Sequence, residues 1–343
     1  MNQTRRGRML AWRIGATPGI EHLEQVELEV PAPGPGEVLV RLRAASINRR
    51  DLMVVEGAWR PAPPPSLVPL SDGAGEVVEA GPGVTGLKAG DRVAGVFSQR
   101  WQAGEPAEHH HGATLGAPLP GVLWQFRVFP EGGLVKIPPH LSHEEAACLP
   151  VSGVTAWSAL FGQQQLPPGG TVLILSSGNV ALLATQLAHA AGARTIVASR
   201  TTGHRERLEG LGADHVVQLS PDGAWVEAVL ALTGGEGVDL VVDTVGTTLP
   251  HSVAAARVGG AVSVVGLLGG VKAELSVVQL LARQPRLLGV NVGSRAAFER
   301  LNAALALHGL RPPVAVCYPM SEAREALDAA GRGGHFGKVV VSL

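Results

Sequence analysis

Six residues from Ser176 to Ala181 read SSGNVA, a pattern that could bind the phosphates of a nucleotide. A tight turn before a helix presents free backbone N–H groups and the positive end of the helix dipole, and both attract a pyrophosphate. Of the three glycines in the dinucleotide-binding pattern only Gly178 is kept, although Ala181 is an accepted last residue. A turn without a ligand therefore stays an alternative. The predicted cofactor-binding residues of the turn are Ser177, Gly178, Asn179 and Val180.

A second candidate group follows about twenty residues later, at Ala198-Ser199-Arg200. Sheets that bind NAD usually end their second strand with a carboxylate, which accepts hydrogen bonds from the adenine ribose. No carboxylate is present here. Ser199 and Arg200, with His204 or Arg205 on the following turn, could hold a 2′-phosphate through charge-assisted hydrogen bonds. The sequence therefore predicts NADPH as the cofactor, with NADH less favoured, and a solvated loop arginine at Arg200 as the alternative.

A βαβ unit is needed to position these residues. Thr171 to Leu175 is a short apolar run typical of a buried strand, and apolar residues then recur at the i, i+3, i+4 spacing of one helix face as far as Gly192. Residues that favour strands resume from Thr195 to Ala198. Thr171 to Arg200 is therefore predicted to form strand, turn, helix and strand.

Strand and helix patterns continue to alternate, which predicts a parallel, doubly wound sheet. The expected elements are a helix from about His204, strand His215 to Leu219, helix Trp225 to Leu232, strand Val238 to Asp243, helix from about Thr248 and strand Ala261 to Leu267. From Met9 to about Pro130, short alternating runs between Pro and Gly turns predict an antiparallel barrel or sandwich. Ser142 and Glu145 then form a capping box. A helix near Arg295 to His308 and a strand from Lys338 to Ser342 can return to this first domain.

Composition limits the class of protein. The chain of 343 residues has material for about two domains, and its net charge of -1 gives no electrostatic footprint for nucleic acid or an anionic membrane. Its only cysteines, Cys148 and Cys317, exclude a disulfide framework and a four-cysteine zinc lobe. No window approaches about 18 uninterrupted apolar residues, and the basic start of the chain lacks an apolar signal region. We expect a soluble, cytoplasmic protein that acts on small molecules and binds neither nucleic acid nor membrane.

Seven segments resemble one known superfamily in their order and spacing. They are SINRRDL at Ser46 to Leu52, VPLSDGAGEVVEAGPGV at Val68 to Val84, AGDRVAG at Ala89 to Gly95, LPVSGVTAWSAL at Leu149 to Leu160, LGADHVV at Leu211 to Val217, NVGSR at Asn291 to Arg295 and HFGKVVVSL at His335 to Leu343. Together they resemble the medium-chain dehydrogenase/reductase superfamily. The resemblance implies an α/β protein with a GroES-like β-barrel domain at 1–151 and 291–343 and a doubly wound Rossmann domain at 152–290. It also implies a homodimer formed through the sheet edge near 261–288.

Zinc alcohol dehydrogenases of this superfamily hold their catalytic metal with cysteine, histidine and cysteine. The matching positions here are Asn48, Ser71 and Val151. An amide, a hydroxyl and a valine cannot replace those ligands, so a zinc Lewis acid is not expected. The region of the structural zinc reads EPAEHHHGATLG, without cysteine. The chain therefore resembles the zinc-independent, quinone oxidoreductase-like branch, and no metal site is predicted.

Matching positions imply further contacts with the cofactor. They are Arg49, Thr155, Gly266, Leu267, Gly293, Ser294 and Lys338. Arg49 and Lys338 match positions where related enzymes place cations near the pyrophosphate. Structural alternatives are that Gly266 ends a strand and that Lys338 is an exposed lysine on the terminal strand.

Three polar residues are candidates for the reaction itself. Asn48 is expected nearest the reacting carbonyl or the nicotinamide ribose, where its amide can donate a hydrogen bond to a developing oxyanion. Asp51 and Asp72 are expected close by, although Asp51 could instead anchor a turn and Asp72 could cap backbone N–H groups. The nicotinamide carries the hydride, so the protein has mainly to position the substrate and exclude water.

A run of three histidines, His109 to His111, could also recruit a metal ion. Adjacent residues of an extended loop point in alternating directions and do not preform a tetrahedral site. We therefore expect a solvated loop here.

Three functions remain open from the sequence. The first is an NADPH-dependent reductase of quinones, enones or related carbonyls. The second is a zinc-free alcohol or aldehyde dehydrogenase. The third is a nucleotide-binding or redox-sensing protein without turnover, because Ser176 and Asn179 could crowd a pyrophosphate in the glycine turn.

Overall fold

Each of two units of the chain carries its own β-sheet, and the computed structural model describes residues 7–59, 64–163 and 165–343. The first unit comprises Met1–Val151 and Gly293–Leu343, and the second comprises Ser152–Val292. The chain therefore leaves the first unit once and returns to it with its C-terminal segment. None of the helices in the described ranges combines the length and the apolar character that crossing a lipid bilayer requires.

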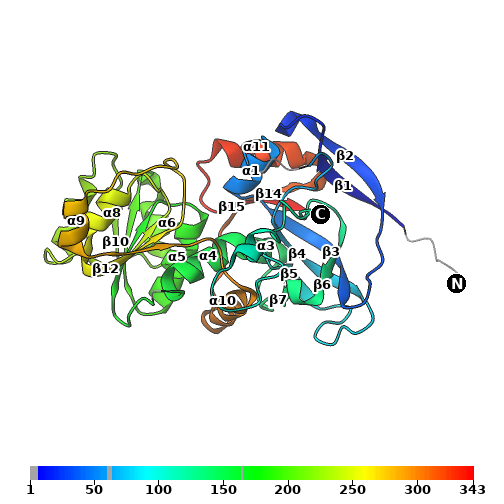
Figure 1. Ribbon diagram of the computed structural model, residues 1–343, viewed down its shortest axis with the longest axis horizontal. Coiled ribbons are helices and arrows are strands. Elements are labelled where there is room, and N and C mark those ends of the chain that lie inside the picture. The colour runs from blue at the N-terminus through cyan, green and yellow to red at the C-terminus, as the bar shows by residue number, and fades with distance from the viewer. Residues whose placement is uncertain (1–6, 60–63, 164) are drawn as a thin grey trace. The chain divides into compact units, whose positions relative to one another are not determined.

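The second unit, coloured from green to orange in Figure 1, is built on a six-stranded parallel sheet. Its strand order is β10-β9-β8-β11-β12-β13. Its strands are β8 (Thr171–Leu175), β9 (Arg194–Ser199), β10 (His215–Gln218), β11 (Val238–Asp243), β12 (Ala256–Val264) and β13 (Arg286–Gly289). The order reverses between β8 and β11, as in sheets that bind dinucleotides at this reversal. The predicted parallel, doubly wound sheet is confirmed.

Helices cover both faces of this sheet. They are α4 (Val154–Phe161), α5 (Asn179–Ala190), α6 (Arg205–Gly210), α7 (Trp225–Leu232), α8 (Leu249–Ala255) and α9 (Val277–Arg283). Helix α5 packs on β8 and β9, while α8 packs on β11 and β12. The apolar run Val172 to Leu175 is fully buried, as a strand covered on both faces requires.

The first unit contains a seven-stranded sheet in which β6 pairs with β3 beside the path β14-β15-β3-β4-β5-β7. Its strands are β3 (Glu37–Ser46), β4 (Asp72–Ala80), β5 (Arg92–Gly95), β6 (Phe126–Pro130), β7 (Leu134–Lys136), β14 (Val314–Pro319) and β15 (Lys338–Ser342), and a separate hairpin is formed by β1 (Arg8–Ile14) and β2 (Leu23–Glu29). Its helices are α1 (Arg49–Val55), α2 (Glu108–His111), α3 (His143–Ala147), α10 (Arg295–His308) and α11 (Ala323–Arg332). Strand β3 joins the C-terminal strand to the N-terminal ones, because it pairs with both β15 and β4.

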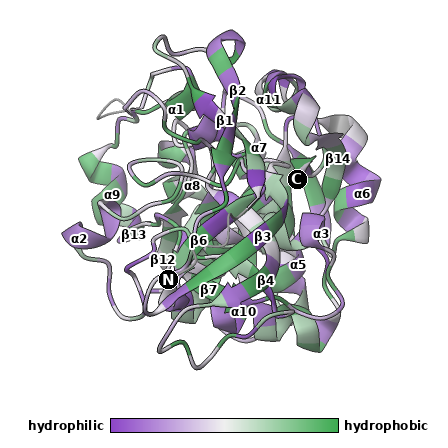
Figure 2. Cartoon of the chain, turned by 90° about the vertical axis from the view of Figure 1, so that its right-hand side faces the viewer, coloured by the Kyte–Doolittle hydropathy of each residue, from purple (hydrophilic) through white to green (hydrophobic). Residues whose placement is uncertain are grey.

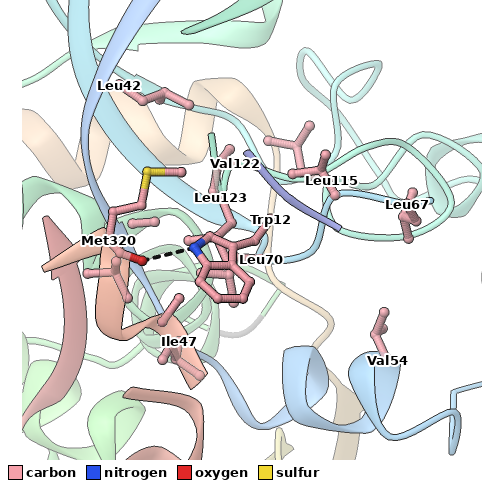
Figure 3. Packing of buried hydrophobic residues seen from close by; sticks show 14 of the residues in the cluster. Trp12, Leu42, Ile47, Val54, Leu67, Leu70, Leu115, Val122, Leu123 and Met320 are labelled. Carbon is pink, nitrogen blue, oxygen red and sulfur yellow. Dashed lines mark hydrogen bonds between the residues drawn. The ribbon is translucent and has the colours of Figure 1, made fainter. Parts of the chain in front are cut away.

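The core of the first unit holds its early and late segments together. Trp12 of β1 packs among buried aliphatic residues and donates its indole N–H to the Met320 carbonyl at 2.9 Å (Figure 3). Phe129 of β6 and Val341 of β15 are fully buried in the same core. Apolar residues of β3 line the interior, whereas the short helix α2 is hydrophilic (Figure 2). The C-terminal return is therefore part of the first unit's packing.

Local signals placed several elements at their observed bounds. The predicted capping box is confirmed: Ser142 Oγ accepts the Glu145 N–H at 3.2 Å, and the Glu145 carboxylate accepts the Ser142 N–H at 2.7 Å. The strand predicted at Ala261 to Leu267 is wrong in its bounds, because β12 runs from Ala256 to Val264. The chain turns out of the sheet after Val264.

The expectation of an extended loop at the three histidines is also wrong. These residues lie in α2, and His110 is buried with its ring stacked on Trp101 at a centroid distance of 5.1 Å. His110 Nδ1 accepts the Ala107 N–H at 3.0 Å. The His109 ring packs edge-on against the His110 ring at a centroid distance of 4.2 Å, so His110 has a structural role.

Candidate functional site

The turn between β8 and α5 contains one residue in an unusual backbone conformation. Ser176 stands at the first glycine position of the dinucleotide-binding pattern, and its φ of 79° lies in the left-handed region that favours glycine. Its Oγ lies 2.8 Å from Thr244 Oγ1 and accepts the Gly178 N–H at 3.1 Å. Because Thr244 donates its own proton to the Leu175 carbonyl at 2.6 Å, Ser176 is the donor of the hydroxyl pair. The Ser176 side chain is thereby held by groups of the protein itself.

Gly178 is the N-cap of α5. The packing around it does not require a glycine. A Cβ at this position would lie 3.4 Å from Ser176 Oγ and 3.8 Å from Leu268 Cδ1, which are ordinary contacts. The next N–H groups, those of Asn179 and Val180, precede the first helical bond, which Leu182 makes to the Gly178 carbonyl. A glycine without a steric reason beside such donors fits a ligand that approaches the backbone closely. The turn therefore fits the pyrophosphate of a dinucleotide.

Polar residues from the turn after β8 and from the segment that ends β9 form what we call the Ser199 network: Ser177, Ser199, Arg200 and His204. Ser199 Oγ donates to Ser177 Oγ at 3.1 Å and accepts the Thr201 N–H at the same distance. Ser177 Oγ lies 3.0 Å from His204 Nδ1. Burial, with a smaller contribution from Arg207, lowers the pKa of His204. The structure thus brings three of the predicted residues together, and the exposed Arg200 follows Ser199 directly.

The other predicted residues of the second unit differ in their surroundings. Thr155 is buried in α4, and Leu267 is 57% exposed. A Cβ at Gly266 would lie 2.0 Å from the Thr244 carbonyl oxygen, so the packing of the chain already requires glycine there. Gly266 and Leu267 follow β12 in a loop and do not end the strand. Thr244, which the sequence did not single out, contacts both the turn and this loop.

In the first unit, α1 begins directly after Asn48 and places it in a ring of hydrogen bonds. The Asn48 backbone N–H donates to Asp51 Oδ2 at 2.9 Å, and Ser71 Oγ donates to Asp51 Oδ1 at 2.6 Å. Asn48 Nδ2 donates to Ser71 Oγ at 3.5 Å. Asp51 therefore anchors the start of α1, as its structural alternative expected. One indication of a role for Ser71 was present in the sequence, namely that it stands at a position where zinc alcohol dehydrogenases have a metal ligand.

Lys338, at the start of β15, completes this group. Its Nζ donates to Asn48 Oδ1 at 2.5 Å, to the Ile47 carbonyl at 3.1 Å and to Asp72 Oδ2 at 3.4 Å. The residue is 1% exposed. The alternative of an exposed lysine is wrong, and the ammonium predicted to lie near a pyrophosphate is directed at acceptors of the protein. We call Ser46, Asn48, Asp51, Ser71, Asp72 and Lys338 the Asn48 cluster.

Asp72 is the most deeply buried charge of the Asn48 cluster. Burial raises its pKa to about 6, although Lys338 and then a hydrogen bond from Asn48 act in the opposite direction. Ser46 Oγ lies 3.3 Å from Asp72 Oδ2 and also donates to the Ala147 carbonyl at 2.8 Å. The other carboxylate oxygen, Oδ1, has no hydrogen-bond partner among the described residues. Asp72 thus faces Lys338, Ser46 and the Asn48 side chain, and no backbone N–H group of the described residues donates to it.

The remaining predicted residues lie in the first unit. Arg49 is exposed at the first position of α1. Ser294 is buried and caps α10, since its Oγ accepts the Ala297 N–H at 3.2 Å, and the buried Gly293 precedes it. A helix cap therefore accounts for Ser294 in structural terms.

The three positions at which zinc ligands were considered do not fit a zinc ion. Asn48 and Ser71 are hydrogen bonded to one another, and Val151 has no donor atom. The Lys338 ammonium, 2.5 Å from Asn48 Oδ1, would repel a divalent cation. In the three described ranges, no group of three or more His, Cys, Asp or Glu residues is placed to hold a metal ion.

Two family models match the chain. Residues 34–139 match the alcohol dehydrogenase GroES-like domain, and residues 180–307 match the zinc-binding dehydrogenase model. A zinc-type alcohol dehydrogenase-like protein of Schizosaccharomyces pombe is 35% identical over 95% of this chain and 96% of its own length. A chloroplast envelope quinone oxidoreductase homolog of Arabidopsis thaliana is 36% identical over 66% of this chain and 64% of its own. The crystal structure of an inferred alcohol dehydrogenase from Sinorhizobium meliloti has a TM-score of 0.92 at 37% identity, covering 98% of this chain and 99% of that one.

Proposed function

The chain belongs to the medium-chain dehydrogenase/reductase superfamily and is an NAD(P)-dependent oxidoreductase, and from this premise we propose that it transfers hydride from NADPH to a quinone, enone or related carbonyl without zinc. The observation that carries the proposal is the Asn48 cluster. Where zinc alcohol dehydrogenases have metal ligands, this chain has a hydrogen-bonded amide and hydroxyl backed by an ammonium. Such a group supports stabilisation of a reacting oxygen by hydrogen bonding.

In this proposal, the bound nicotinamide supplies the hydride and the residues of the chain prepare the acceptor. Asn48 Nδ2 donates to Ser71 Oγ at 3.5 Å and to Asp72. In the reaction it exchanges the long bond to Ser71 for one to the carbonyl oxygen, whose negative charge grows as hydride arrives at the conjugated carbon or the carbonyl carbon. Asp51 and Asp72 act as positioning residues, because they are 1% and 0% exposed and hold Ser71, Asn48 and Lys338. The low exposure of the cluster also supports exclusion of water from these groups.

NADPH is proposed over NADH because of the Ser199 network. The end of β9 offers hydroxyls, an imidazole and an exposed guanidinium, and it carries no carboxylate to accept hydrogen bonds from a ribose. These groups suit a 2′-phosphate. The alternative of a protein without turnover rested on crowding of the turn by Ser176 and Asn179. The hydroxyl of Ser176 is hydrogen bonded to Thr244 and to the Gly178 N–H, which removes the argument for Ser176.

We also propose a cytoplasmic homodimer. The strand β13 forms an edge of the parallel sheet, and α9 beside it has no buried residue. Val277, Val278 and Leu281 are 69%, 76% and 71% exposed, which is unusual for apolar side chains that remain in water. Light scattering after gel filtration tests the dimer: a monomer at micromolar concentration would contradict it.

The function is tested first with metal-free protein, titrated in parallel with NADPH and NADH by nicotinamide fluorescence and then supplied with quinones, enones, aldehydes and alcohols. We expect tighter binding of NADPH and chelator-resistant oxidation of NADPH that depends on a quinone or enone. Asn48→Ala is expected to lower kcat by roughly 100-fold, as loss of an oxyanion donor does, with NADPH affinity unchanged. Activity restored only by added zinc, or oxidation of alcohols alone, would contradict the proposal and favour an alcohol dehydrogenase.

A further inference from the structure

We infer that Lys338 is a positioning residue that sets the orientation of the Asn48 amide, so that Asn48 offers an N–H donor and not its carbonyl oxygen to the substrate. This inference rests on the proposed function. Lys338 Nζ lies 2.5 Å from Asn48 Oδ1, and its other two contacts, with the Ile47 carbonyl and Asp72, hold it in place. A matching position in related enzymes suggested a cofactor cation, and the contacts of Lys338 suggest a different role.

The chemistry of the neighbours allows only one orientation of the amide. A lysine ammonium has donors and no acceptor, so it must face the oxygen of the amide. If the amide were turned over, Nδ2 would stand against the ammonium, donor against donor. The flipped oxygen would then face Ser71 Oγ, whose proton is already donated to Asp51 at 2.6 Å. Asp72, which also accepts a hydrogen bond from the Asn48 side chain, would lose that donor. All three neighbours therefore favour the same orientation.

The remaining bonds make this preference rigid. Asp51 cannot release Ser71 easily, because its second oxygen accepts the Asn48 backbone N–H at 2.9 Å. The ring therefore closes through Asn48, Asp51 and Ser71, with Lys338 entering at the amide oxygen. A cation on the amide oxygen also polarises the amide and strengthens its N–H groups as donors. Lys338 thus acts on the substrate through Asn48 and does not touch it.

The amide orientation matters because the two ends of Asn48 have opposite effects on a carbonyl. An N–H group stabilises the negative charge that develops on the substrate oxygen, whereas an amide oxygen in its place repels that charge. A mixture of the two orientations would lower the rate of hydride transfer and leave the binding of NADPH unchanged. This separates the inference from a role of Lys338 at the pyrophosphate, which would alter cofactor affinity.

The test compares Lys338→Met and Lys338→Arg in the full-length protein, with Lys136→Met as the control. Lys136 lies in the same unit, but its side chain is 58% exposed. We expect Lys338→Met to lower kcat at least ~10-fold, a part of the loss expected when the donor is removed altogether. We expect KM and NADPH affinity to stay within about twofold, a range too small to indicate lost contacts. Lys338→Arg, which keeps a donor-only cation, is expected to retain more activity.

Two further measurements separate orientation from folding and from the proposed function. Lys338→Met leaves the buried Asp72 without its cation, so the double variant Lys338→Met/Asp72→Asn is made to remove that charge. If the double variant recovers stability but keeps a low kcat, the inference is supported. If it recovers kcat, the inference is overturned. The side-chain amide resonances of Asn48 are followed by ¹⁵N NMR without substrate. They should shift or broaden in Lys338→Met and not in Lys136→Met. Unchanged resonances overturn the inference, and a wild-type protein that reduces no carbonyl overturns only the proposed function.

Discussion

The Asn48 cluster and the Ser199 network are both built from polar and charged side chains, but the first is buried and the second is partly exposed. In the Asn48 cluster, Asn48, Asp72 and Lys338 are 8%, 0% and 1% exposed, and their hydrogen bonds run to one another. In the Ser199 network, Ser199 is buried but His204 is partly exposed and Arg200 is exposed. The closed cluster spends its bonding capacity on fixing one orientation, whereas the open network keeps charge available for an anionic ligand.

The two regions therefore control different measurable properties: stability and reaction rate for the Asn48 cluster, and cofactor affinity for the Ser199 network. A closed group of buried charges is coupled to folding and to the rate of the reaction, because any lost partner leaves a buried polar atom unsatisfied. An open network of hydroxyls and cations is coupled to the affinity for a phosphate, because water replaces the ligand when it leaves.

The charge of Asp72 is the first way to break the closed cluster. Its pKa rises from 3.8 to about 6 in the folded protein, so the folded state binds more protons than the unfolded state between these values. The wild type should therefore lose stability relative to Asp72→Asn as the pH rises from about 4 to 6, by up to about 3 kcal/mol, and the difference should be constant above. Urea unfolding of both proteins over this range measures it.

Asp91 provides the matched control for this prediction. Burial raises the pKa of Asp91, but hydrogen bonds from Lys136 and Lys88 outweigh burial, so the net shift is downward. The wild type should gain stability relative to Asp91→Asn as the pH rises, the reverse of the trend for Asp72. If the wild type also gained stability with pH relative to Asp72→Asn, then Lys338 would outweigh burial. The conclusion that burial raises the pKa of Asp72 would then be wrong.

Gly178→Ala tests whether the turn between β8 and α5 binds the phosphates of the cofactor. A methyl group fits the fold at Gly178 but occupies space that a pyrophosphate would approach, so NADPH affinity should fall about 10-fold while the unfolding free energy changes by less than about 1 kcal/mol. Gly210→Ala, in open space on α6, should leave affinity unchanged. Gly266→Ala should instead destabilise the protein, by about 1–3 kcal/mol, because its Cβ would overlap the Thr244 carbonyl. Equal affinities for Gly178→Ala and Gly210→Ala would exclude the turn as a phosphate site.

His204 gives the smallest expected effect and separates the two cofactors. Burial and the nearby Arg207 lower the pKa of His204 from its ordinary value of 6.5, so the imidazole gains its charge at a lower pH than an ordinary histidine does. NADPH affinity should rise by roughly threefold to tenfold as the pH falls and the imidazole becomes protonated, and NADH affinity should not. The 2′-phosphate itself titrates at about pH 6, so part of the pH dependence of NADPH affinity comes from the ligand. The decisive comparison is therefore with His204→Gln, in which the part of the pH dependence that comes from the imidazole should be lost. Identical pH profiles for the two proteins would remove His204 from the site.

Local patterns in the sequence determined most of the second unit. The apolar runs at Thr171–Leu175 and Val238–Asp243 and the helix periodicity at Trp225–Leu232 gave the observed bounds, because a strand covered on both faces and an amphipathic helix are specified by neighbouring residues. The end of β12 and the helix α2 were not recovered. In the first case the close approach of Gly266 to Thr244 turns the chain, and in the second His110 packs on Trp101. Both depend on contacts outside the local pattern.

The residue types at Asn48, Asp51, Asp72 and Lys338 were visible in the sequence, and so was the absence of zinc ligands. Their partners were decided only by the tertiary structure. Ser46 at the end of β3 pairs with Val340 of β15 on one side and with Asp72 of β4 on the other, and this register brings Lys338 to Asn48 across 290 residues of chain. A hydrogen bond between side chains depends on strand register to within one residue, which composition and periodicity do not specify.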